Sequence, residues 1–255
     1  MKPDLFTPQN RNVLLVVLLL LSMLFSAFDE GYIRIISPFL WAMIATGFGL
    51  ALWLARTSST ERFMALSLSI FVMEYIKESM GIRAGLWEYH GDTGRYAFGV
   101  WVWVLVGLDA HTLAMRFLHP QFQKRLQMLH RIPRWVSPLS LAVISLSIPL
   151  LLGPNVRGVG VFFWIFYSIL LIIGCITAFR VGFMGFASFV LVAWAVAAPS
   201  EIAGSVASGV WTYPHDKDGP PLFLIVGCWP LEILAQAGLA GLFMGETILS
   251  PMDKA

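Results

Sequence analysis

The chain has 255 residues, of which 58% are hydrophobic and 13% charged, with a formal net charge of +2 and a mean hydropathy of +0.75. A soluble domain carries roughly 25% charged residues, so this composition cannot cover a water-facing surface and excludes a soluble protein. The small net charge and the lack of a basic domain also argue against nucleic-acid binding.

Apolar runs near twenty residues recur along the chain and predict an all-α integral membrane protein with about eight transmembrane helices. Transmembrane β-strands would instead show alternating segments of about ten residues. The first run follows Lys2 and Arg11 and resembles a signal peptide, but the internal repeat described below favours a retained helix. In chain order, the expected spans are 13–28, 32–55, 63–80, 96–117, 136–153, 158–178, 182–206 and 221–244.

Positively charged residues predict the orientation of these spans. If the N-terminus is inside, eleven of the 17 Lys and Arg residues fall on the inner side, so the positive-inside rule places both termini in the cytoplasm. Residues 116–134 hold the densest positive charge. We expect a solvated inner loop there, and the alternative is a segment lying on the inner leaflet.

Two segments of the chain share one motif. Residues 78–92 read ESMGIRAGLWEYHGD, and residues 201–216 read EIAGSVASGVWTYPHD. Both contain Glu-x-x-Gly, then Gly-x-Trp-x-Tyr, then His and Asp, at an offset of 123 or 124 residues. The offset is about half the chain, so it predicts two parallel four-helix repeats, 1–118 and 135–255, joined by a basic cytoplasmic connection over 119–134. Both motifs would then leave the membrane on one side, and their acids would face a shared interior.

Acidic residues within the expected spans are the first candidates for chemistry. An Asp at the centre of a membrane helix costs about 2.5–3.5 kcal/mol on insertion scales, so such residues need a functional or structural reason. Two of the acids recur in the shared motif, and two more recur near mid-span at an offset of 123. The predicted catalytic acids and bases are Glu78, Glu201, Asp109 and Glu232.

Other polar residues in the spans are interpreted as structural. Glu74 and Lys77 lie three residues apart on a helix and predict an ion pair that holds helices together. His111 is expected to be a polar packing residue. Cys175 and Cys228 stand alone in apolar runs, and we expect both to be small core residues.

Aromatic residues accompany the acids. The predicted substrate-binding residues are Trp87, Tyr89, Trp211, Tyr213, Trp103 and Trp229. Aromatic faces stabilise cations through the ring quadrupole, so aromatic walls beside carboxylic acids suit a carbocation in a hydrocarbon substrate. An aromatic belt at the membrane interface is the alternative. A belt does not explain the same order occurring twice with a fixed acid and two glycines.

The expected outer loops hold His90, Asp92, His215, Asp216 and Asp218, which could together ligate a metal. Neither loop has diagnostic spacing, and Asp beside Gly is ordinary turn chemistry. We therefore predict no metal and no other cofactor. The sequence also lacks Walker, Rossmann, His-Glu-x-x-His and Gly-x-Ser-x-Gly motifs, so nothing supports nucleotide-driven or hydrolytic activity.

Residues 209–233, GVWTYPHDKDGPPLFLIVGCWPLEI, resemble the membrane lycopene cyclase domain. That family also has tandem helical units, with a Trp near the end of one helix and Pro-aliphatic-Glu-Glu inside the next. By position, Glu232 in Pro230-Leu231-Glu232 would be the family's acidic residue, although only one Glu is present here. The Glu-x-x-Gly-x-x-x-Gly that begins at Glu78 is similar to carotenoid hydratases of the bisanhydrobacterioruberin type.

The resemblance implies a membrane enzyme of carotenoid or isoprenoid biosynthesis, either a cyclase-like isomerase or a hydratase (a lyase). Its substrate would be a long isoprenoid, changed by acid-initiated cyclisation, hydration or isomerisation. A proton-coupled small-molecule transporter is the first alternative, since parallel repeats and mid-span acids fit a carrier as well. A non-catalytic subunit of a membrane complex is the second, suggested by a stripe of small residues at Gly47, Gly49, Ala51 and Ala55.

Overall fold

The computed structural model describes residues 7–152, 161–214 and 224–245, and within these ranges the chain is almost entirely helical. The helices are α1 (Pro8–Asp29), α2 (Pro38–Thr57), α3 (Thr60–Arg83), α4 (Ala97–Thr112), α5 (His119–Arg125), α6 (Val136–Leu152), α7 (Val161–Glu201) and α8 (Trp229–Met244). The shorter elements are η1 (Tyr32–Arg34), β1 (Glu88–Tyr89), η2 (Leu113–Leu118), η3 (Gln127–Arg131), η4 (Ile202–Val206), β2 (Trp211–Thr212) and η5 (Leu224–Cys228). The predicted all-α class is confirmed.

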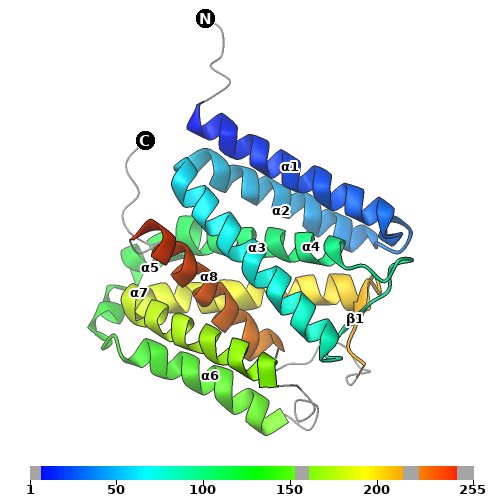
Figure 1. Cartoon of the computed structure of the whole chain (residues 1–255). Coiled ribbons are helices and arrows are strands. Elements are labelled where there is room, and N and C mark those ends of the chain that lie inside the picture. The colour runs from blue at the N-terminus through cyan, green and yellow to red at the C-terminus, as the bar shows by residue number, and fades with distance from the viewer. Residues whose placement is uncertain (1–6, 153–160, 215–223, 246–255) are drawn as a thin grey trace, which may run out of the picture.

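The helices form one bundle in which α1 and α2 lie at one side and α6 at the opposite side (Figure 1). Between them, α3 packs on α8, α4 packs on both α2 and α7, and α7 packs on α8 and α6. The four predicted acids, Glu78, Asp109, Glu201 and Glu232, come from the central helices α3, α4, α7 and α8. They therefore lie in the interior of the bundle.

Capping residues explain where three of the helices begin. Thr7, Ser37 and Ser59 each accept a hydrogen bond from the backbone N–H three residues later, at 3.3 Å, which satisfies a free donor of the first turn. Pro38 follows Ser37 directly, and proline is favoured in the first turn. This local chemistry starts α2 at residue 38, so the predicted span of 32–55 began six residues too early.

Five helical segments of the described ranges are long and apolar enough to cross a membrane. They are Pro8–Asp29, Pro38–Thr57, Ala97–Arg125, Val161–Val206 and Leu224–Met244. Large apolar side chains point outward from them, for example Phe25 and Phe162, which are 73% and 76% exposed. Apolar surfaces of this extent fit contact with lipid. The 24-residue α3 is not among the five, and it carries Glu74, Lys77 and Glu78 in its second half.

Gly182 interrupts α7 near its middle. Its φ of 69° lies in the left-handed region that favours glycine, and its ψ of 179° is not helical. The break falls at the first residue of the predicted span 182–206, four residues after the end of the predicted span 158–178. Two helical segments therefore follow one another within α7, with Tyr167 on the first and Glu201 at the end of the second.

Glu30 joins the end of α1 to the start of α4. Its two carboxylate oxygens accept hydrogen bonds from the backbone N–H groups of Ala97 and Phe98, each at 3.1 Å. The N-cap residue of α4, Tyr96, makes no side-chain cap of its own. Burial raises the pKa of Glu30, and the two backbone hydrogen bonds act against that shift. Glu30 thus supplies the negative group that the N-terminus of α4 lacks.

We expect Glu30→Ala to lower the free energy of unfolding by about 1–2 kcal/mol, the usual cost of losing a helix cap. Thermal unfolding in mild detergent measures it. The matched control is Asp29→Ala, because Asp29 pairs with Arg95 at 2.9 Å on the surface. Such exposed pairs contribute about 0.2–1 kcal/mol. Equal losses in the two variants would contradict the capping role.

Candidate functional site

Glu78 lies near the end of α3 and accepts two side-chain hydrogen bonds. Its Oε2 receives the indole N–H of Trp87 at 2.8 Å and the phenol of Tyr89 at 2.9 Å. The carboxyl group is almost fully buried, with 1% of the residue exposed. The chain turns back after α3, so that both aromatic residues of the first motif reach the acid of the same motif.

Glu201, the last residue of α7, has the same arrangement in the second motif. Its Oε2 receives the indole N–H of Trp211 at 3.1 Å and a short hydrogen bond from the phenol of Tyr213. A third donor is added here, because the indole N–H of Trp229 reaches Oε1 at 3.1 Å. The two motifs therefore produce the same acid–Trp–Tyr contacts.

A glycine in each motif makes room for the tryptophan. A Cβ at Gly81 would overlap the indole ring of Trp87, and a Cβ at Gly204 would overlap that of Trp211. Glycine three residues after the acid lets the indole lie directly on the helix backbone. This contact is the physical reason for the Glu-x-x-Gly spacing.

We expect Gly204→Ala to lower the free energy of unfolding by about 1–3 kcal/mol, because overpacking must displace a buried ring. Gly49→Ala is the control, since a Cβ there meets nothing within 4 Å and the residue lies inside α2. That control should be neutral or stabilise by up to about 1 kcal/mol. Comparable losses in both variants, measured by thermal unfolding, would contradict the close approach of Trp211.

The two motifs meet in a short antiparallel pair of strands. Glu88 of β1 lies opposite Thr212 of β2, and Tyr89 lies opposite Trp211. The pairing extends to His90, whose N–H donates to the carbonyl of Val210 at 3.0 Å. It joins segments more than 120 residues apart. The two acid sites, which are Glu78 and Glu201 with their Trp and Tyr donors, therefore lie side by side.

Trp103 of α4 lies between the two acid sites. Its indole N–H donates to the hydroxyl of Tyr89 at 3.1 Å, so it extends the hydrogen-bond chain of Glu78. Its ring centroid lies 4.8 Å from that of Trp211 and 4.9 Å from that of Trp229. The three indoles thus form a continuous aromatic wall between the two carboxyl groups.

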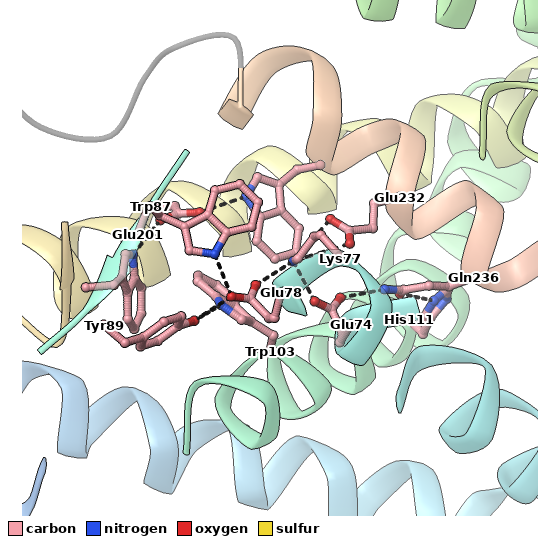
Figure 2. Close-up of polar contacts among 12 residues, drawn as sticks. Glu74, Lys77, Glu78, Trp87, Tyr89, Trp103, His111, Glu201, Glu232 and Gln236 are labelled. Atoms are coloured by element: carbon pink, nitrogen blue, oxygen red, sulfur yellow. Dashed lines mark hydrogen bonds and ion pairs between the residues drawn. The ribbon is translucent and has the colours of Figure 1, made fainter. Parts of the chain in front are cut away.

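Lys77 is the cationic centre of the site (Figure 2). Its Nζ lies 2.5 Å from Glu74, 3.3 Å from Glu232 and 3.6 Å from Glu78. The ammonium also lies 4.6 Å from the ring centroid of Trp229, within the range of a cation–π interaction. The predicted ion pair with Glu74 is present, but sequence reasoning missed the contacts with Glu78 and Glu232.

A buried polar chain continues from Glu74 across the bundle. The side-chain amide of Gln236 on α8 donates to Glu74 at 2.8 Å, and its oxygen lies 3.2 Å from Nε2 of His111 on α4 (Figure 2). His111 is fully buried, in agreement with its predicted role as a polar packing residue.

The two acid sites border one cavity of about 50 Å³. All six predicted aromatic residues line it, together with Lys77, Glu78, Glu201 and Glu232. Side chains from α7 that sequence reasoning did not select complete the wall, namely Phe163, Phe166, Tyr167 and Leu170. Trp211 and Trp229 are among the largest fully buried side chains, so these aromatic residues form an internal wall instead of an interfacial belt.

Asp109 is the one predicted acid that does not line the cavity. Its carboxylate lies on the far side of α4, where a Cβ on Gly47 of α2 would overlap it. Its Oδ1 is buried and has no hydrogen-bond partner among the described residues. Of the four predicted catalytic acids, the site therefore brings together Glu78, Glu201 and Glu232.

The two tyrosines stay available as hydrogen-bond donors. Burial raises the pKa of Tyr89 well above its ordinary value, and the neighbouring carboxyl of Glu78 raises it further. Burial acts in the same way on the pKa of Tyr213, with Glu201 as the neighbour. Each phenol therefore stays protonated, and its O–H donates a hydrogen bond to a carboxyl oxygen.

Within the described ranges, no group of three or more His, Cys, Asp and Glu side chains could hold a metal ion. His215, Asp216 and Asp218 lie outside those ranges. Of the two cysteines, both partly buried, Cys228 lines the cavity and Cys175 does not.

Comparisons with protein-family models, with curated proteins and with solved structures find no match to this chain.

Proposed function

We propose that the protein is a membrane enzyme that protonates a carbon–carbon double bond of a long isoprenoid or carotenoid substrate. The observation that carries this proposal is the pair of carboxyl groups, Glu78 and Glu201, held by matched Trp and Tyr donors at one aromatic cavity. The resemblance of residues 209–233 to membrane lycopene cyclases points to the same substrate class.

The charges of the site support acid chemistry. Among the described residues, three buried carboxyl groups, those of Glu74, Glu78 and Glu232, lie 2.5–3.6 Å from the Lys77 ammonium, and the buried carboxyl group of Glu201 borders the same cavity. Full ionisation would leave three uncompensated negative charges in a buried environment. Burial and mutual repulsion disfavour that state, so we expect one of the cavity carboxyl groups, from Glu78, Glu201 or Glu232, to hold a proton. The site thus keeps a carboxylic acid beside an apolar cavity at neutral pH.

The proposed reaction begins when a carboxylic O–H of Glu78 or Glu201 gives its proton to one alkene carbon. The π electron pair forms the new C–H bond and leaves a carbocation on the neighbouring carbon. The faces of Trp103, Trp211 and Trp229 stabilise that cation. The second carboxylate then accepts a proton from an adjacent carbon, which regenerates a double bond, so that no redox partner is needed.

Cyclisation and hydration follow from the same cation. In cyclisation, a second double bond of the substrate attacks the cation and forms a C–C bond before the proton is lost. In hydration, a water oxygen bonds to the cation and the carboxylate accepts a proton from that water. After either route the first acid has lost its proton and the second carboxylate has gained one, so one proton must pass back between the two acids before the next turnover.

The cavity wall on α7 offers a route for an apolar substrate. Phe163, Phe166 and Leu170 line the cavity, and Phe162, Ile165 and Ile169 on the same helix are exposed on the outer, lipid-compatible face. With a cavity of about 50 Å³, only a short reacting segment of the substrate fits beside the acids. The rest of a long polyene would lie along α7 in the lipid.

Extraction of bound molecules from protein purified in mild detergent tests this proposal. We expect a polyene or other isoprenoid at near-stoichiometric amount, identified by absorption and mass. Leu170→Trp fills the cavity and should remove that molecule, whereas Ile169→Trp, on the exposed face, should retain it. If phospholipid alone is recovered from a host that makes isoprenoids, the proposal is wrong.

We further propose that the chain crosses the membrane eight times, as two parallel four-helix repeats with both termini in the cytoplasm. Helices α1 to α4 make the first repeat, and α6, the two segments of α7 and the η5–α8 helix make the second. The break at Gly182 and the matched contacts of the two motifs support this division. The excess of Lys and Arg on one side supports the orientation.

A proton-coupled transporter is the second candidate function. The buried Lys77–carboxyl cluster favours it, because carriers place buried ionisable residues along their ion and substrate pathways. Proton-dependent uptake into vesicles, without any bound polyene, would support the carrier over the enzyme.

A further inference from the structure

A second pocket, of about 370 Å³, lies between α7 and the basic segment that follows α4. It is lined by His119 and Gln123 of α5, by His130 and Arg134, and by α7 at Arg180 and Gly182. No residue of this pocket lines the aromatic cavity. Gly182 is separated from Glu201 by 19 residues of helix, or roughly 28 Å along the axis, so the two sites are distinct.

The two charged side chains that line this pocket, Arg134 and Arg180, are both positive. The sequence contains no Asp or Glu between Asp109 and Glu201, whereas Lys and Arg occur seven times in that stretch. No ion pair with Arg134 or Arg180 occurs among the described residues. Within the part of the chain that the structure describes, the two guanidinium groups that line the pocket therefore pair with no carboxylate.

The groups around the pocket are the donors that a phosphate needs. Guanidinium groups bind phosphate through paired N–H donors, with geometric specificity. The second segment of α7 also begins here, because Gly182 ends the first one, and the first N–H groups of a helix lack intrahelical partners. Two guanidinium groups, two imidazoles and a helix start thus surround a space large enough for a phosphate-bearing headgroup.

Exposed apolar side chains beside the pocket indicate that a phosphate bound there would belong to a lipid. Met128 is 69% exposed and Trp135 is 59% exposed, next to the basic residues of the same segment, and Phe179 of α7 is 48% exposed. Tryptophan beside basic residues, as at Arg134-Trp135, is typical of the membrane interface. Exposed apolar groups next to an anion site can contact the acyl chains of a lipid, whereas a soluble anion would make no favourable contact with them.

We propose that this pocket binds the phosphate headgroup of an anionic membrane lipid, with Arg134 and Arg180 as its principal ligands. Basic pockets at the ends of membrane helices have this function in other proteins. The site is independent of the proposed reaction, because it uses none of the cavity residues. It would anchor the α5–η3 segment to α7 at the membrane surface.

The test measures the thermal unfolding midpoint of the detergent-solubilised protein against added phosphatidylglycerol, since a ligand that binds the native state raises the midpoint. We expect a saturable rise with phosphatidylglycerol, and a much smaller one with phosphatidylcholine of the same acyl chains. Arg134→Gln combined with Arg180→Gln should weaken the apparent lipid affinity at least about tenfold, as expected for charged hydrogen bonds. Without lipid, the double variant should unfold at the wild-type midpoint, because both side chains are exposed.

The matched control combines Arg125→Gln with Arg131→Gln, two exposed residues of the same basic segment that do not line the pocket. It removes the same charge and should keep the wild-type lipid affinity. An equal loss in the control would overturn the proposal in favour of diffuse attraction. A rise produced equally by phosphatidylcholine would overturn the need for an anionic lipid, and one produced by inorganic phosphate alone would overturn the assignment to a lipid.

Discussion

Replacing Glu78 or Glu201 by glutamine should lower conversion of the isoprenoid substrate by about 10²–10⁴-fold, the usual contribution of a positioned general acid or base. Glutamine keeps an oxygen that can accept the hydrogen bonds of Trp87 and Tyr89, or of Trp211 and Tyr213. It cannot release or accept the transferred proton. The cavity should therefore keep its shape while the reaction stops. Mass analysis of isoprenoids from cells that express each variant measures the conversion.

The control for both variants is Glu88→Gln. Glu88 lies in β1 next to the site, but its side chain is exposed and does not line the cavity. It removes the same charge from the same region and should leave conversion unchanged. Folded Glu78→Gln and Glu201→Gln proteins with full conversion would contradict the assignment of both acids.

Replacing Lys77 by methionine should lower the free energy of unfolding by about 3–5 kcal/mol, the cost of removing one partner from a buried charge cluster. The ammonium is the shared partner of Glu74, Glu78 and Glu232. Methionine has a similar length and leaves those carboxyl groups without their cation. Thermal unfolding in detergent measures the loss.

A double variant separates charge from packing in that result. Combining Lys77→Met with Glu74→Gln removes one cation and one of its carboxylates, and the amide can still accept from Gln236. We expect this pair to recover part of the lost stability, because less negative charge stays buried and unpaired. If the losses of the two single variants simply add, the cluster is not held together by charge.

The sequence predicted the helical framework well, because helix ends depend on local chemistry. The predicted spans 63–80 and 221–244 match α3 and the η5–α8 helix to within a few residues. The shared motif also predicted that Glu78 and Glu201 face one interior, and both line the same cavity. Its Glu-x-x-Gly spacing carried that information, since each glycine admits the indole of its own motif.

Contacts between distant helices could not be predicted in the same way. By offset, Asp109 corresponds to Glu232, yet only Glu232 reaches the cavity. At the same offset of 123 residues, Lys77 corresponds to Ser200. The second half of the chain therefore has no cation at the position that would pair with Asp109. The two halves of the site therefore have matching hydrogen bonds but different charged residues. Only the packing of α3 on α8 shows that Glu232, and not Asp109, borders the cavity.

The aromatic residues of α7 were missed for a different reason. Phe163, Phe166 and Tyr167 lie in an apolar run outside the shared motif, where an inward-facing ring and a lipid-facing ring have the same sequence signal. Neighbours such as Phe162 and Ile165 do face outward. Only the rotation of α7 against α6 and α8 separates the two sets.

Deuterium incorporation from solvent shows whether a carboxylic acid of the site protonates substrate carbon. Membranes containing the protein would be incubated in D₂O with the isoprenoid recovered from it, and the product analysed by mass after exchange of labile deuterium. We expect one non-exchangeable deuterium on carbon in the product, and none with Glu78→Gln or Glu201→Gln. A product that forms at full rate without deuterium on carbon, or a substrate that crosses the membrane unchanged, would contradict it.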